Sequence, residues 1–152
     1  MQSAGVARTA QGPRPIARSV GAVVAGFATT FALSMGIDVV LHATGVYPAW
    51  GVRMADALFV LALAYRGLAT VAGGWVTARL APARPMGHAL ILAAVGTLVG
   101  LGGVAFSVNH PELGPMWYPA LLVLTAIPCV FAGAWLRARA APSQLQLSDG
   151  EG

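Results

Sequence analysis

The chain has 152 residues, of which 57% are hydrophobic and only 9% are charged, and its mean hydropathy is +0.73. Soluble domains carry about a quarter charged residues, so this composition excludes an ordinary soluble domain and indicates an integral membrane protein. The net charge of +4 comes from arginines that flank apolar segments, which favours membrane anchoring over nucleic-acid binding. A single cysteine, Cys129, excludes an intrachain disulfide and a cysteine-based zinc site.

Residues 1–19 contain three arginines and no acidic residue, which predicts a disordered cytoplasmic tail. The apolar run that follows, residues 20–43, is too long for the core of a signal peptide and is the first predicted transmembrane span. Small or polar residues recur along it at steps of four and form a ridge on one side of a helix. The ridge consists of Gly26, Thr30, Ser34, Asp38 and His42.

The second predicted span, residues 57–78, has an arginine near its middle, Arg66. A central arginine costs about 2.5–3.5 kcal/mol on insertion scales, so this span needs neighbouring helices to hold it in the membrane. Arg66 lies on a stripe of small and polar residues, which directs the charge toward other helices or a wet cavity rather than toward lipid. The stripe consists of Ala62, Arg66, Thr70, Gly73 and Thr77.

The third predicted span, residues 88–108, carries a seam of small residues at spacings of four and three. Such a seam predicts a close contact with another helix. Its members are Ala89, Ala93, Gly96, Gly100 and Gly103. The fourth predicted span covers residues 116–136, with Pro128 expected to kink it, and residues 139–152 are expected to form a flexible cytoplasmic tail.

The arginines outside the spans predict the orientation. Seven of these eight lie in the two tails and the 79–87 connector, and only Arg53 lies in the other two loops. The positive-inside rule therefore places both termini in the cytoplasm. The predicted fold class is an all-α membrane protein with four transmembrane helices in an antiparallel bundle. The use of arginine in place of lysine, with many alanines and glycines, indicates a GC-rich bacterial source and hence the bacterial inner membrane.

Residues 72–82 and 132–142 match at seven of eleven positions. One interpretation is convergence, because a small residue, an interfacial Trp, an Arg and a Pro suit any helix that ends at this membrane face. The other is a duplication of one helical hairpin, giving two hairpins in parallel orientation. Both interpretations remain open from the sequence.

Asp38 and Arg66 are the main candidates for a functional site. At a rise of 1.5 Å per residue they lie about 7 Å and about 13 Å from the outer ends of their spans, and an arginine side chain can cover that difference. They form either a structural ion pair or an ion or proton site. In both interpretations the polar group includes three neighbours on the same stripes, His42, Ser34 and Thr70.

His42 and His110 both fall at the predicted outer side, where they could ligate a metal or haem iron. Histidines at the headgroup level are more often simply amphipathic residues. No nucleophile-and-base pattern, phosphate loop or metalloprotease motif occurs. We therefore expect a protein that is not an enzyme and has no cofactor.

The stretch GGWVTARLAP at residues 73–82, followed by RPM at 84–86 and HAL at 88–90, resembles that of small four-span bacterial membrane proteins of uncharacterised activity. The resemblance implies the four-span fold and supplies no site. We expect a non-enzymatic small transport or accessory component, whose partners are the lipid bilayer and either further copies of itself or another membrane protein. The alternative is a haem- or metal-binding redox membrane protein that uses His42 and His110.

Overall fold

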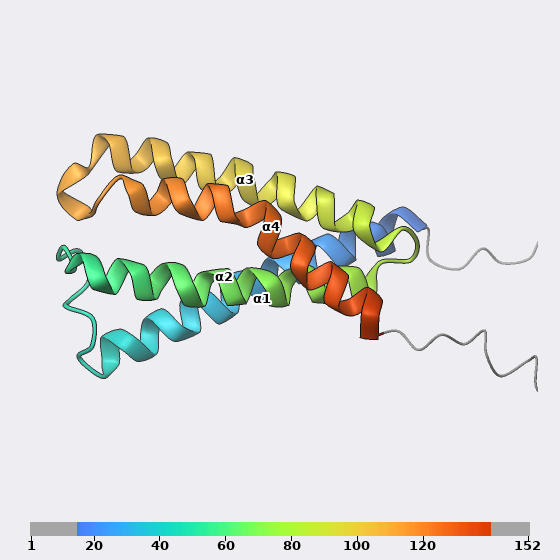
Figure 1. The fold of residues 1–152 in the computed structure, drawn as a ribbon, viewed down its shortest axis with the longest axis horizontal. Helices are drawn as coiled ribbons and strands as arrows, with labels where there is room; N and C mark the ends of the chain where they lie inside the picture. The colour runs from blue at the N-terminus through green and yellow to red at the C-terminus, as the bar shows by residue number, and fades with distance from the viewer. Residues whose placement is uncertain (1–14, 141–152) are drawn as a thin grey trace, which may run out of the picture.

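The computed structural model describes residues 15–140, and this range is built from helices (Figure 1). The long helices are α1 (Pro15–Ala43), α2 (Asp56–Leu80), α3 (Pro85–Asn109) and α4 (Trp117–Ala140), and a short 3-10 helix, η1 (Pro111–Leu113), precedes α4. Each long helix is apolar and long enough to cross a membrane. Within the described range the prediction of an all-α fold is confirmed, and so is that of four helices long and apolar enough to span a membrane.

The helices are longer than the predicted spans. Residues 15–19 and 139–140, which we assigned to tails, belong to α1 and α4. Proline is favoured at the first position of a helix, because its missing N–H would have no partner there, so α1 can begin at Pro15. The helices continue past their hydrocarbon-length cores into flanking arginine-bearing turns. The rest of the two predicted tails, residues 1–14 and 141–152, lies outside the described residues.

The connections between the helices lie at the two ends of the molecule. The 44–55 loop and η1 lie at one end, and the 81–84 turn lies at the other, beside the start of α1 and the end of α4 (Figure 1). Gly45 and Gly51 have φ angles of 74° and 82°, which glycine adopts without strain, and they shape the 44–55 loop. Arg84 also has a positive φ, 47°, where the chain reverses before Pro85.

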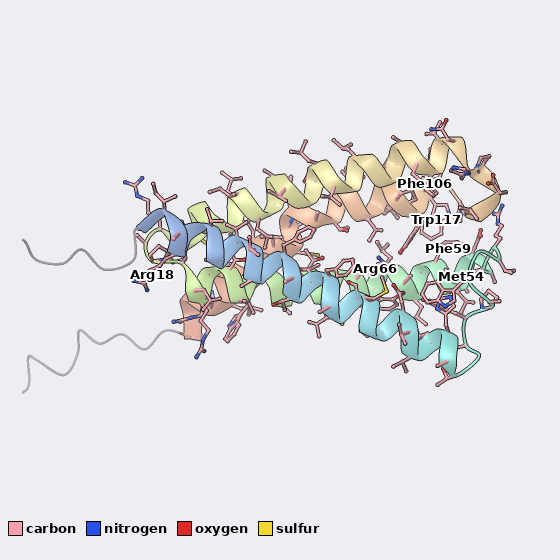
Figure 2. All side chains as sticks on the ribbon, turned by 180° about the vertical axis from the view of Figure 1, so that it is seen from behind. Arg18, Met54, Phe59, Arg66, Phe106 and Trp117 are labelled. Atoms are coloured by element: carbon pink, nitrogen blue, oxygen red, sulfur yellow. The ribbon has the colours of Figure 1, made fainter. Side chains whose placement is uncertain are left out.

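α2 is the central helix of the fold. It packs against α1, α3 and α4, and its contact with α4 is the most extensive. α1 and α4 make no direct packing contact within the part of the chain that the structure describes. They diverge toward the end that carries the 44–55 loop (Figures 1 and 2).

α1 and α2 cross where Gly26 meets Gly73. A Cβ atom on Gly26 would overlap Thr77 and the carbonyl oxygen of Gly73, and one on Gly73 would overlap Thr30 and the carbonyl oxygen of Gly26. The Thr30 hydroxyl lies 3.3 Å from the carbonyl oxygen of Ala69 and donates across the crossing. Small residues spaced four apart on both helices thus allow backbone contact. Gly73, on the stripe that carries Arg66, therefore packs against a neighbouring helix in the structure.

The small-residue seam of α3 forms only part of the expected contact. Ala89 and Ala93 are buried, and a Cβ atom on Gly100 would lie 2.8 Å from Val123 of α4. A Cβ atom on Gly96 or Gly103 would meet nothing within 4 Å, so the expected contact is wrong at these two positions. At about 100° per residue, Gly96 and Gly103 are rotated about 20° and about 40° from Ala89, away from the side that carries the other members.

α4 contains Pro128 at its centre, and Figure 1 shows the helix changing direction about halfway along its length. Proline removes one backbone hydrogen bond and clashes with the preceding turn, so an interior proline bends a helix. The expected kink of α4 agrees with this change of direction. The bend lets the second half of α4 cross α2, while the first half follows α3.

Candidate functional site: an ion pair beside a pocket

Asp38 of α1 is buried, with only 5% of its surface exposed, although it is an acidic residue in an apolar helix. Both carboxylate oxygens accept hydrogen bonds from α2: Tyr65 donates its hydroxyl to Oδ1, and Arg66 donates through Nη2 to Oδ2. A buried charge is costly unless it is paired and hydrogen-bonded. The structure therefore brings the two predicted charged residues together and adds a phenol that the sequence analysis missed.

Arg66 is less enclosed than its partner, since 35% of its side chain is exposed against 7% for Asp38. Its guanidinium also interacts with the phenol of Tyr118, at the start of α4. Its Nε atom is buried and has no hydrogen-bond partner among the described residues. The pair is thus closed on the Asp38 side and open on the Arg66 side.

His42 lies one helical turn beyond Asp38. Its Nδ1 is 2.8 Å from the main-chain oxygen of Asp38, and a carbonyl oxygen only accepts, so Nδ1 carries the hydrogen. In the neutral ring this leaves Nε2 as an acceptor. The imidazole stacks on Trp50, with ring centroids 3.6 Å apart and planes 4° from parallel, and it meets the edge of Tyr47.

Ser34 and Thr70 lie one turn from the ion pair on α1 and α2. Ser34 is buried on the same face as Asp38. The Thr70 hydroxyl lies 2.8 Å from the main-chain oxygen of Arg66 and donates to it, so its hydrogen bond is satisfied within its own helix. Both residues lie on the predicted polar stripes, but among the described residues neither side chain is bonded to the carboxylate of Asp38 or to the guanidinium of Arg66. Neither side chain therefore belongs to the charged cluster.

A pocket of about 250 Å³ lies beside this cluster, at the end that carries the 44–55 loop. Its polar lining includes Asp38, Arg66 and His42, and Trp50, Phe59 and Tyr118 are among the aromatic residues around them. Figure 2 shows Arg66 in the region between α1 and the α3–α4 pair, with Met54, Phe59 and Trp117 nearer the loop end. The ion pair therefore faces a space that a small molecule could enter.

The second histidine belongs to a different cluster. His110 Nδ1 lies 3.1 Å from Glu112 Oε1, and its ring is 4.4 Å from that of Phe106. The pKa of the exposed Glu112 is lowered by a hydrogen bond from its own main-chain N–H and then by His110. The loop ends of α1 and α3, which carry the two histidines, are on opposite sides of the molecule in Figure 1. Among residues 15–140, no group of three or more potential metal ligands occurs.

Sequence reasoning missed the aromatic residues of the site. Tyr65 directly precedes Arg66, and a tyrosine inside a span beside a charge was a usable signal. Tyr47 and Trp50 could not be assigned to the site from the sequence, because their contacts with His42 depend on how the 44–55 loop folds over α1. Comparisons with protein-family models, with curated proteins and with solved structures found no match. The function is therefore inferred from the geometry of the site.

Proposed function

We propose that this chain is a four-span protein of the bacterial inner membrane, with antiparallel helices and both termini in the cytoplasm. It acts as a non-enzymatic transport or accessory component, either as a homo-oligomer or together with another membrane protein. It binds a small molecule in the pocket beside Asp38 and Arg66. The arginine distribution supports the orientation, because Arg79 and Arg84 flank the connector at the end opposite the pocket. The pocket then opens on the periplasmic side.

One observation carries the binding role: the ion pair lines a cavity and is not sealed between helices. α1 and α2 already pack closely through the contact between Gly26 and Gly73. Replacing a buried ion pair by apolar residues is often neutral or stabilising. Helix packing alone therefore does not explain why an ion pair is present here. A charged pair that is reachable from a pocket suits the binding and orientation of a ligand.

The proposal is tested by extracting and identifying the small molecules that stay with the purified protein. The wild type is compared with Arg66→Met and Tyr118→Phe, which alter the pocket, and with Thr125→Ala, whose hydroxyl bonds to its own helix at Leu121. We expect one compound to be retained by the wild type and by Thr125→Ala and to be depleted in both pocket variants. Equal small-molecule content in all four folded proteins would contradict the proposal. A Soret band in the absorbance spectrum would support the haem alternative instead.

A further inference from the structure

The charges that line the pocket cancel. Asp38 and Arg66 are its only residues with a fixed charge, and they are bonded to each other. Each oxygen of Asp38 already accepts a hydrogen bond and the residue is buried, so a cationic ligand would have to compete with Arg66 for the carboxylate. An anionic ligand would add a charge that nothing in the pocket balances, and such a charge is costly away from water. The electrostatics therefore favour an uncharged ligand.

The pocket offers both donors and an acceptor. Arg66 has more N–H groups than the one that Asp38 uses, and Tyr118 adds a hydroxyl. His42 commits its Nδ1 hydrogen to the main chain of Asp38, which leaves the lone pair of Nε2 as an acceptor. A ligand that satisfies both sides carries an oxygen that accepts from Arg66 or Tyr118 and a hydroxyl hydrogen that it donates to His42.

The aromatic side chains that line the pocket favour a ligand with a flat ring. Trp50, Tyr47, Phe59 and Tyr118 line the pocket, and aromatic side chains pack well against planar groups. The volume of about 250 Å³ lies below the range of roughly 300–1,000 Å³ that is usual for whole drug-sized ligands, so the pocket suits a head group. Because α1 and α4 make no direct packing contact in the described range, an apolar chain attached to that ring can run out between them.

We infer that the pocket binds the head group of a quinol, an uncharged ring with two hydroxyl groups, whose apolar tail lies between α1 and α4. The inference rests on the proposed function and names its ligand class. A quinone has only acceptor oxygens and leaves His42 Nε2 without a hydrogen, so it binds more weakly than the quinol. A fatty-acid carboxylate adds an unbalanced charge and binds more weakly still.

The test is calorimetric titration of the full chain in detergent under anaerobic conditions with three probes: decyl-ubiquinol, decyl-ubiquinone and laurate. We expect the quinol to bind about tenfold more tightly than the quinone, as the loss of one hydrogen bond predicts, and laurate to bind more weakly than both. In His42→Phe, which keeps a ring to stack on Trp50, the quinol should fall to the affinity of the quinone. His110→Phe, in the other cluster, should keep the wild-type preference.

The quinol inference is overturned if laurate binds most tightly, if the quinol preference survives His42→Phe, or if none of the three probes binds to the folded protein. Retention of some other compound by the wild type and not by Arg66→Met would then leave the proposed function intact while the ligand class fails. If no compound is retained and no probe binds, both the ligand class and the proposed function are wrong. Circular dichroism of each variant checks that it is folded before titration.

Discussion

Gly74 of α2 lies so close to the main chain of Val130 in α4 that an added Cβ atom would overlap the Val130 carbonyl group. Gly133 has the corresponding relation to α2, where a Cβ atom would overlap the carbonyl oxygen of Val71. The central helices of the fold therefore cross with their backbones in contact. Gly74 and Gly133 lie in the matching stretches 72–82 and 132–142, whereas Val71 and Val130 precede them. The crossing is compatible with both duplication and convergence.

Alanine at either crossing glycine should destabilise the protein. Alanine normally raises helix stability by about 1 kcal/mol relative to glycine, but overpacking against an unyielding backbone costs about 1–3 kcal/mol. Gly74→Ala and Gly133→Ala should therefore each lower the melting temperature in detergent. Gly36→Ala is the matched control, because a Cβ atom there meets nothing within 4 Å. Melting temperatures equal to that of the control would show that α2 and α4 do not cross at these residues.

Two glycines of α3 provide a second matched pair. Gly100→Leu should destabilise the helix bundle, because its new side chain meets Val123 of α4, whereas Gly103→Leu should be tolerated, because that position is open. The measurement is thermal unfolding of both variants in the same detergent. Equal loss of stability in the two variants would restore the five-member seam that the sequence predicts, with Gly103 as part of a helix contact.

The predictions that depend on helical period agree best with the structure. The stripes that contain Gly26 and Asp38 on α1 and Gly73 and Arg66 on α2 face each other, because residues four apart share one face of a helix. The choice of partner helix could not be predicted, since nothing in the spacing shows that α2 contacts α4 more than α1. The stack of His42 on Trp50 was also beyond prediction, because it depends on the conformation of the 44–55 loop.

The topology predicts which fusions are active. Alkaline phosphatase works only after export, so fusions after Gly51 or Glu112 should be active, and fusions after Arg84 or Ala140 should be inactive. The measurement is phosphatase activity normalised to the amount of each fusion protein. The opposite pattern, or activity at Arg84, would contradict an orientation with both termini in the cytoplasm and would place the pocket on the cytoplasmic side.

Tyr65 should matter more than Tyr47. Its hydroxyl donates to the buried carboxylate of Asp38, whereas the Tyr47 hydroxyl, 3.2 Å from the main-chain oxygen of Leu58, donates to a neutral acceptor. Hydrogen bonds to charged groups contribute about 1.5–3 kcal/mol, and neutral ones contribute about 0.5–1.5 kcal/mol. Tyr65→Phe should therefore lower the melting temperature more than Tyr47→Phe. The reverse ranking would mean that the tyrosine does not support the ion pair.

The most direct measurement is a double-mutant cycle on Asp38 and Arg66. Arg66→Gln leaves the buried carboxylate of Asp38 without its charged partner, and Asp38→Asn leaves the half-buried guanidinium of Arg66 without its own, so each should lower thermal stability. The double variant should lose less than the sum of the two, with a coupling energy of about 0.5–3 kcal/mol, as for residues in contact. Strict additivity of the two losses would show that Asp38 and Arg66 do not pair, and would contradict the site from which the pocket and its ligand were inferred.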